Sequence, residues 1–184
     1  MARIRALKPN VTQEEATELF SPPTLAAKVR DFIFGPVRSV ADFYIPFRIY
    51  QVEILNGDQK SVHFFGLDMV TGALDLYTWE KLPEQNEMFL LETRNRLSVL
   101  LSDQDAQCKV TDKVRRLIFA QGFFRIRNFR ITAEAVPGDV HIPYWAAFRG
   151  HGIRASISVL DAVRRRMEGA RVRQMLREWL TSVH

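Results

Sequence analysis

Arginines that stand beside aromatic residues are the side chains in this sequence best suited to binding chemistry. One group shares a short segment with Phe123, Phe124 and Phe129, and it consists of Arg125, Arg127 and Arg130. A second group lies near the C-terminus and consists of Arg164, Arg165, Arg166, Arg171, Arg173 and Arg177. Guanidinium groups hold phosphates through paired hydrogen bonds, and aromatic rings stack on nucleobases. Both groups are therefore candidates for contact with a nucleic acid or an acidic protein. A solvated basic face, or contact with the chain's own first half, would use the same residues.

Two aspartates occupy matching positions in two similar stretches, Gly66–Val70 and Val159–Val163. A pair of carboxylates brought together could transfer protons as general acid and base. A commoner role for such a residue is to accept backbone hydrogen bonds in a turn, with a glycine nearby at positive φ. We therefore assign Asp68, Gly72 and Asp161 to structural turns and expect no catalytic residue.

Histidine and cysteine give little support to metal or nucleophilic chemistry. The sequence has no HxH, HxxxH or CxxC pattern, and its histidines are His63, His141, His151 and His184. It also lacks a P-loop and the GxGxxG, GxSxG and HExxH motifs. The lone Cys108 cannot form an internal disulfide, which fits a reducing compartment. We predict a non-enzymatic protein without cofactor or metal ion.

The charge of the chain is distributed unevenly. Residues 1–108 contain 11 Lys and Arg against 15 Asp and Glu, whereas residues 109–184 contain 15 against 6. The formal charges are therefore −4 and +9, so either the halves attract one another or the second half faces an acidic partner. No apolar run approaches the length of a membrane span, and the N-terminus does not resemble a secretory signal. These features predict a cytoplasmic protein without a membrane span.

Helices are indicated at three places by capping residues and apolar periodicity. Thr12 and Glu15 have capping-box spacing, and Ser21-Pro22-Pro23 should end that helix. A second helix is expected over 24–34, a third from about 111 to 121 and a fourth over 172–183. The segment 88–101 is leucine-rich and is predicted to be mostly helical. The apolar stripe of the second helix consists of Leu25, Val29, Phe32 and Ile33.

Alternating apolar residues and turn signals predict the strands. Strands over 50–54 and 62–69 should form a hairpin at Asn56-Gly57-Asp58, followed by a strand over 73–79. Later strands are expected over 123–135, 141–148 and 153–159. Proline lacks an amide donor, so the Ile-Pro pairs at 45–46 and 142–143 should start strands or lie at sheet edges.

Three stretches of the first half recur in the same order in the second half, which suggests an internal duplication. Residues 28–35 match 113–119, the Ile-Pro-aromatic segment at 45–47 matches 142–144, and residues 66–70 match 159–163. The spacing between the first two matches is about twelve residues longer in the second copy. That copy should therefore contain an added or longer strand over 123–135.

The hairpin from Tyr50-Gln51-Val52-Glu53 to His63-Phe64-Phe65-Gly66-Leu67, followed by Asp68-Met69-Val70-Thr71-Gly72-Ala73-Leu74, resembles the PepSY-type module. The resemblance covers residues 24–74. It implies a helix packed on an antiparallel hairpin, an Asp-x-x-Thr-Gly turn, and a binding or regulatory role. PepSY modules are typically extracytoplasmic. The second copy keeps Asp161 but has Arg164-Arg165 in place of Thr71-Gly72.

Together these patterns predict an α+β fold with two related repeats. Each repeat is expected to pack a helix on an antiparallel sheet of three or four strands, with a C-terminal amphipathic helix in addition. The predicted divisions are an N-terminal segment 1–20, repeat 1 over 21–101 and repeat 2 over 102–184. The predicted function is protein–protein interaction, as a small accessory or assembly subunit of a larger complex. The alternative is nucleic-acid binding by the basic second half.

Overall fold

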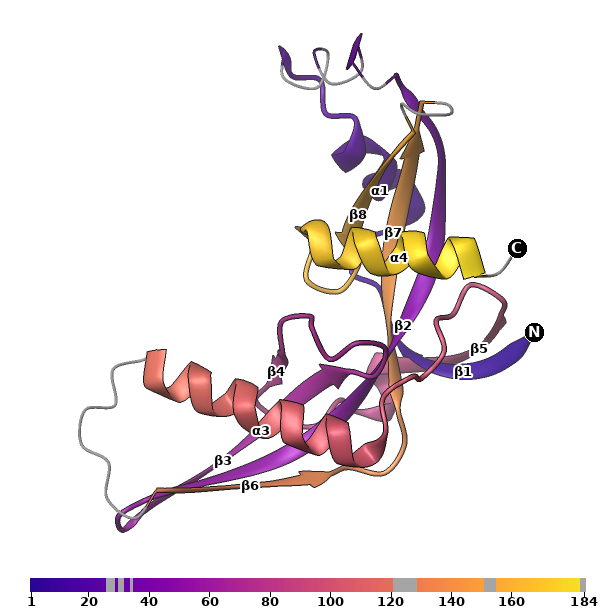
Figure 1. The fold of residues 1–184 in the computed structure, drawn as a ribbon. Helices are drawn as coiled ribbons and strands as arrows, with labels where there is room; N and C mark the ends of the chain where they lie inside the picture. Colours follow the sequence, from indigo (N-terminus) through magenta and orange to yellow (C-terminus); the bar gives the residue numbers. More distant parts are fainter. Residues whose placement is uncertain (26–28, 30–31, 34, 121–128, 151–154, 183–184) are drawn as a thin grey trace. The chain divides into compact units, whose positions relative to one another are not determined.

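A mixed β-sheet dominates the computed structural model of the chain (Figure 1). The structure describes residues 1–25, 29, 32–33, 35–120, 129–150 and 155–182. Its helices are α1 (Gln13–Phe20), α3 (Asp103–Ala120) and α4 (Ala170–Ser182), with a 3₁₀ turn η1 at Gln85–Glu87. The strands are β1 (Ala2–Leu7), β2 (Val37–Asn56), β3 (Gln59–Asp68), β4 (Tyr77–Trp79), β5 (Met88–Thr93), β6 (Arg130–Ala135), β7 (Val140–Arg149), β8 (Ser156–Asp161) and β9 (Arg166–Met167).

Within the described part of the chain, all nine strands join one sheet with the order β4-β3-β2-β7-β1-β5. In addition, β6 pairs with β2, β8 pairs with β7, and β9 pairs with β8. The predicted fold of two repeats, each with a helix on its own small sheet, is therefore wrong. The reason is β2, which runs for 20 residues and changes neighbours along its length. Its residues 43–47 are all buried, so the alternation that marks a strand is lost there.

Contacts divide the chain into two compact units that are discontinuous in sequence. Unit 1 contains Met1–Tyr44, Phe89–Leu97 and Ile142–His184, and unit 2 contains Ile45–Met88 and Ser98–His141. Both β2 and β7 pass from one unit into the other. The contiguous divisions suggested by the sequence stay a prediction.

The core of unit 2 lies between α3 and the strands β2, β3 and β6. Four small or branched residues at helical spacing face the sheet from α3, namely Ala106, Val110, Val114 and Ile118. They pack against Tyr50 and Val52 of β2, Phe65 and Leu67 of β3, and Ala133 of β6. The helix that covers this hairpin within unit 2 is therefore α3.

Unit 1 packs α1 against β7 and β8. The capping box is confirmed, because Thr12 Oγ1 accepts from the amide of Glu15 at 3.3 Å and the Thr12 amide donates to Glu15 Oε2 at 3.0 Å. The helix ends at Phe20, as the following prolines predicted, and Phe20 packs with Ala147 and Leu160. The C-terminal helix is also confirmed as α4, which buries Val172, Met175 and Leu176.

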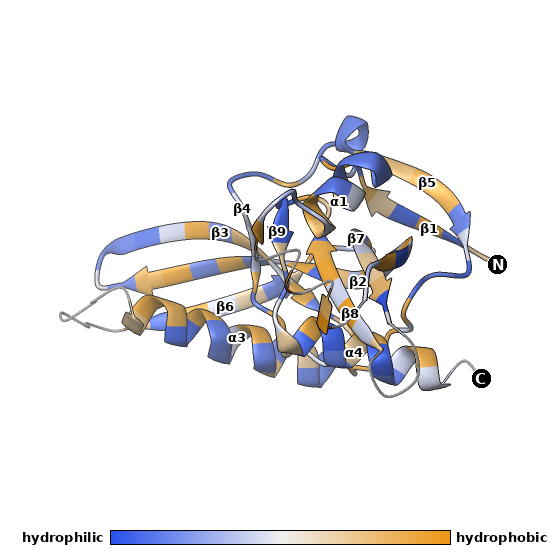
Figure 2. Ribbon diagram, turned by 90° about the horizontal axis from the view of Figure 1, so that it is seen from above, coloured by the Kyte–Doolittle hydropathy of each residue, from blue (hydrophilic) through white to orange (hydrophobic). Residues whose placement is uncertain are grey.

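The segment 88–101 was predicted to be mostly helical, and this is wrong. It contains β5, in which Phe89 and Leu91 pack against Ile4 and Tyr44 while Leu90 is exposed. The strand is hydrophobic over most of its length, as Figure 2 shows, so a period of two could not be recognised in the sequence. Of the third predicted strand only β4 forms. Residues 123–128 of the predicted 123–135 strand, and most of the predicted 24–34 helix, lie outside the described residues.

Both Ile-Pro pairs lie inside long strands rather than at strand starts or sheet edges, so that prediction is wrong. Pro46 comes directly before Phe47, the first residue of β2 that pairs with β3. Pro143 comes directly before Tyr144, the first residue of β7 that pairs with β8. The missing amide therefore falls at the end of a hydrogen-bonded ladder, where the sheet tolerates it.

Candidate interaction surfaces

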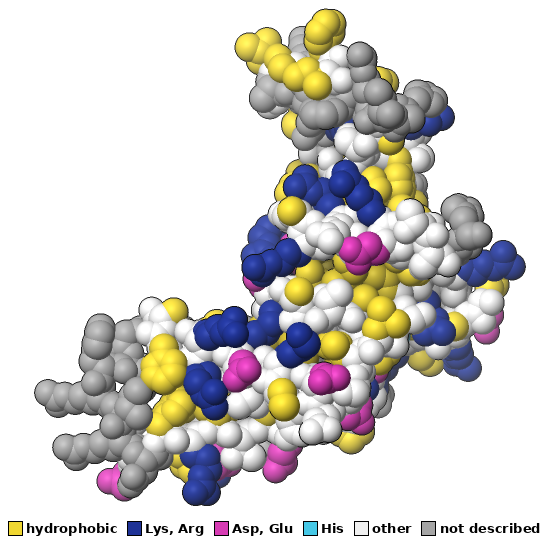
Figure 3. All heavy atoms as spheres, in the orientation of Figure 1, with side chains coloured by type: hydrophobic (Ala, Val, Ile, Leu, Met, Phe, Trp, Pro, Cys, Tyr) yellow, Lys and Arg dark blue, Asp and Glu magenta, His cyan; other side chains and the backbone are white. Residues whose placement is uncertain are grey.

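Four large apolar side chains of unit 1 point into solvent. Leu25, Val29, Phe32 and Ile33 are 80%, 53%, 91% and 51% exposed, and each has helical backbone. We call these four residues the apolar stripe. Their spacing places them on one face of a helix, the kind of face that a globular protein normally buries. Hydrophobic side chains at this end of unit 1 are visible in Figure 3.

A buried arginine anchors the chain on both sides of the apolar stripe. Arg149 of β7 is only 2% exposed, and its guanidinium donates to the carbonyl oxygens of Phe20 and Gly35. Phe20 is the last residue of α1, and Gly35 lies just before β2. One buried side chain therefore holds both Phe20 and Gly35, the residues that flank the segment 21–34.

The C-terminal arginines lie together in unit 1. Arg165, Arg166, Arg171 and Arg177 are exposed, whereas Arg164 and Arg173 are half-buried. Lys and Arg side chains lie over the face of unit 1 that carries α4 (Figure 3). Two of these arginines form ion pairs within unit 1: Arg166 lies 3.2 Å from Glu168, and Arg165 lies 3.7 Å from Glu15.

The other predicted basic group does not join them. Arg130 is exposed at the start of β6, in unit 2, while residues 125 and 127 lie outside the described residues. Counted by unit, the sequence contains 16 Lys and Arg against 9 Asp and Glu in unit 1, and 10 against 12 in unit 2. The formal charges are therefore +7 for unit 1 and −2 for unit 2, a smaller difference than that between the two halves of the sequence.

Each predicted turn aspartate is fully buried and organises the turn after its hairpin. Asp68 Oδ1 accepts from the amides of Thr71 and Gly72 at 2.8 and 2.9 Å, and Oδ2 accepts from the amide of Leu74 at 2.9 Å. Asp161 Oδ1 accepts from the amides of Val163 and Arg164 at 2.9 and 2.8 Å. Backbone amides thus surround both carboxylates. Asp68 belongs to unit 2 and Asp161 to unit 1.

The two turns share an unusual backbone conformation. Gly72 has a φ of +66°, and Arg165, which follows Asp161 by the same four positions, has a φ of +55°. Glycine adopts this left-handed region without strain, but for an arginine it costs about 1–2 kcal/mol. Arg165 is the sole non-glycine residue with positive φ in the described part of the chain.

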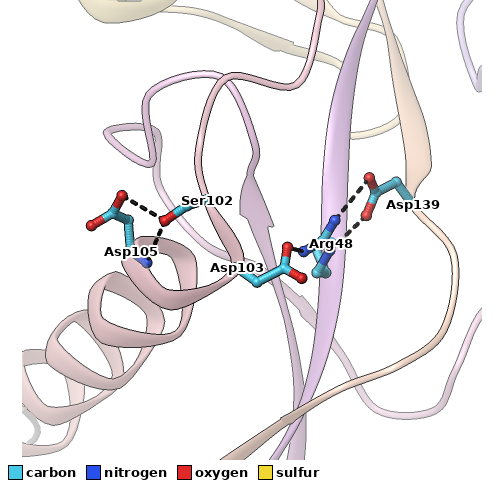
Figure 4. Close-up of polar contacts among 5 residues, drawn as sticks. All are labelled: Arg48, Ser102, Asp103, Asp105 and Asp139. Atoms are coloured by element: carbon cyan, nitrogen blue, oxygen red, sulfur yellow. Dashed lines mark hydrogen bonds and ion pairs between the residues drawn. The ribbon is translucent and has the colours of Figure 1, made fainter.

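An ion-pair network that the sequence did not reveal joins three elements of unit 2 (Figure 4). Arg48 of β2 donates from Nε and Nη2 to the two carboxylate oxygens of Asp139 at 2.8 and 3.2 Å, and from Nη1 to Asp103 at the start of α3. Ser102 caps α3 by accepting from the amide of Asp105 at 3.1 Å. The hydrogen bond with Asp139 raises the pKa of Arg48 above its ordinary value, against the opposing effect of burial. Arg48 therefore stays charged and holds the two aspartates together. Because Asp103 and Asp139 are far from Arg48 in sequence, no short sequence pattern could have predicted these ion pairs.

Unit 2 also contains a cavity of about 270 Å³ beside the C-terminal end of α3. It is lined by Ile54, Ser61, His63, Phe65, Thr78, Leu117 and Ile118. We call it the α3 pocket. Ser61 Oγ and His63 Nε2 lie 3.2 Å apart at its rim.

The described residues contain neither a group of metal ligands nor a membrane-spanning helix. No three His, Cys, Asp or Glu residues among them are grouped so that they could hold a metal ion. No helix in the described ranges is both long and apolar enough to cross a membrane. Cys108 is exposed on α3.

No known protein family, curated protein or solved structure matches this chain. Any function for it is therefore inferred from its own residues. The resemblance of residues 24–74 to PepSY-type modules stays a prediction.

Proposed function

We propose that this protein is a non-enzymatic interaction module that binds another protein through the apolar stripe. The observation that carries this proposal is the exposure of Leu25, Val29, Phe32 and Ile33 at helical spacing. Contiguous exposed apolar residues on a soluble protein typically mark an interaction site. An assembly subunit of a larger complex would use such a surface, and its lone thiol fits a reducing compartment such as the cytoplasm.

The stripe suits a partner that offers a hydrophobic groove. An amphipathic helix binds such a groove through residues at i, i+4, i+7 and i+8, which is the spacing of the stripe. Complete burial of one such side chain is worth about 1.5–3 kcal/mol. The residues that flank the segment, Phe20 and Gly35, are both held by Arg149.

Co-purification from the native source, followed by reconstitution, tests this proposal. The intact chain should form a complex of defined stoichiometry in size-exclusion chromatography with light scattering. The double variant Leu25→Ala/Phe32→Ala should lose the complex, because it removes the two most exposed side chains of the stripe. Leu100→Ala is the matched control, since Leu100 is 71% exposed in unit 2 and should not affect binding. A purified partner that binds the double variant as tightly as the intact chain would contradict the proposal.

A second candidate function is nucleic-acid binding by unit 1. The observation that favours it is Arg165, an exposed arginine held in a strained backbone conformation within a unit of charge +7. A strained residue that glycine could replace at lower cost suggests selection for its side chain.

Salt dependence tests this second candidate. The affinity for a short nucleic-acid duplex or single strand should fall steeply as the salt concentration rises. Removal of one phosphate-binding side chain should reduce the slope of log affinity against log salt concentration by about 0.7–0.9. Arg171→Gln and Arg177→Gln should each reduce it, whereas Arg115→Gln in unit 2, where Arg115 pairs with Asp112, is the control. Absence of binding at low salt would eliminate this candidate.

A further inference from the structure

We propose that the α3 pocket binds a small, uncharged amphiphilic molecule: an aromatic or aliphatic body with one hydroxyl or carbonyl group. The pocket belongs wholly to unit 2, whereas the apolar stripe belongs to unit 1, so this inference does not depend on the proposed protein interaction.

The pocket has an apolar floor that continues the core of unit 2. Phe65 and Ile118 are 3% and 5% exposed and belong to the core between α3 and the sheet, and Ile54 packs against the same cluster. Leu117, which is 39% exposed, stands at the mouth. A ligand body placed here would contact hydrophobic side chains on several sides.

The rim of the pocket is polar and comes from two adjacent strands. Ser61 and His63 are two residues apart on β3, so their side chains lie on one face of the sheet. Thr78 of β4 is directly opposite Phe65 in the strand pairing, which puts its side chain on that same face. Two hydroxyls and an imidazole therefore surround an apolar floor, as in many sites for small molecules.

The described lining contains no lysine, arginine, aspartate or glutamate. Burial of a charged ligand group without a partner of opposite charge is costly, whereas a hydroxyl or carbonyl needs a single hydrogen bond. The rim offers donors and acceptors of that kind, since Ser, Thr and neutral His can each do both. The chemistry of the lining thus favours an uncharged head group.

The volume sets the size of the ligand. A dry cavity of about 150 Å³ is sufficient for benzene. A cavity of about 270 Å³ therefore has room for one substituted ring or a short branched chain. It is too small to hold a nucleotide or a long acyl chain in full.

Titration of the full chain with matched probes, followed by NMR of the Thr78 methyl group and the His63 ring, tests the proposal. The probes are 4-ethylphenol, which has a neutral polar head, 4-ethylbenzoate, which is anionic, and 4-ethyltoluene, which has no hydrogen-bonding group. 4-Ethylphenol should give saturable shifts in the millimolar range. It should bind more tightly than either other probe.

Two variants and one control make the result specific. Leu117→Trp should fill the mouth and weaken 4-ethylphenol binding about tenfold or more, whereas Leu100→Trp should leave it unchanged. Thr78→Val should weaken the binding of 4-ethylphenol but not that of 4-ethyltoluene, because it replaces the hydroxyl by a methyl group of similar size. If 4-ethylphenol does not saturate, or binds Leu117→Trp as well as the intact chain, the pocket is not a ligand site. Equal affinity for 4-ethylbenzoate would overturn the assignment of an uncharged ligand.

Discussion

At the scale of single residues, the turn after β8 shows how one backbone conformation can be occupied by two very different residues. Gly72 and Arg165 both follow a buried aspartate by four positions, and both have positive φ. At position 72 an added Cβ would lie 2.5 Å from Cδ of Lys109, in a flexible side chain that can move aside. Glycine therefore avoids backbone strain in one turn, whereas the arginine in the other turn adopts the same backbone region at a cost.

Replacement of Arg165 by glycine should stabilise the fold. Relief of the left-handed backbone should raise the free energy of unfolding by about 1 kcal/mol, less the flexibility that glycine adds to the unfolded chain. Arg164→Gly is the control and should destabilise, because the strain is at position 165. Urea unfolding measures both changes. A loss of stability in Arg165→Gly would show that contacts such as its hydrogen bond to the Asn10 carbonyl outweigh the strain.

Glu168 gives the protein a pH dependence with a defined direction. Burial raises the pKa of its carboxyl above the ordinary value of 4.5, and the neighbouring Arg166 only partly opposes this. The unfolded chain therefore loses this proton at a lower pH than the folded chain does. The stability that comes from the protonated carboxyl is present below that pH and is lost as the pH rises through the folded pKa.

Glu168→Gln, which resembles the protonated form, should therefore increase the free energy of unfolding at pH 7 and have little effect at pH 4. Denaturant unfolding at both values measures the difference. The control is Glu178→Gln on the exposed surface of α4, where the substitution should matter little at either pH. An equal effect of Glu168→Gln at both pH values would contradict the linkage.

At the scale of elements, Arg48 holds the start of α3 and the segment before β7 against β2. The bidentate pair with Asp139 is shielded, since the two side chains are 18% and 21% exposed, whereas Asp103 is 91% exposed. Shielded, bidentate ion pairs contribute more to the free energy of unfolding than exposed ion pairs, which contribute about 0–1 kcal/mol.

Arg48→Ala and Asp139→Asn should thus each lower the free energy of unfolding by about 1–3 kcal/mol. Asp103→Asn should change it by less than about 0.5 kcal/mol. Thermal or urea unfolding of the three variants provides the comparison. If Asp103→Asn costs as much as Asp139→Asn, the exposed pair contributes more than its exposure implies.

Elements with local signals could be predicted from the sequence, and elements fixed by distant partners could not. The cap and prolines around α1, and the apolar spacing of α4, are short-range features that act within a few residues. By contrast, residues 88–91 of β5 and residues 43–47 of β2 are continuous apolar runs, so neither shows the alternation that would identify a strand. The spacing of Leu25 to Ile33 indicated an apolar face but could not show whether anything covers it. Arg149 and Arg48 gave no signal because their partners are far away in sequence.

At the scale of the whole molecule, the two units are interleaved along the chain. A break after residue 101 separates α3 from the hairpin that it covers in unit 2, and it separates α1 from Ala147 and Leu160 in unit 1. Each half would lose part of both cores, so neither half should fold alone.

Expression of residues 1–101 and 102–184 as separate fragments tests this expectation. Each fragment alone should show no cooperative thermal transition by circular dichroism, and an equimolar mixture should regain one. Two fragments that each unfold cooperatively would support instead the contiguous division at residue 101. The uncut chain is the reference for the recovered signal.

The position of β1 in the sheet also constrains how the protein is made. β1 ends at Leu7 and lies between β5 and β7, but β7 begins only at Val140. A ribosome that adds roughly 5–20 residues per second needs on the order of ten seconds to cover that interval. During this time the strand has left the ribosome and one of its two neighbours does not yet exist. Nascent chains should therefore depend on chaperones that hold them until translation has passed β7.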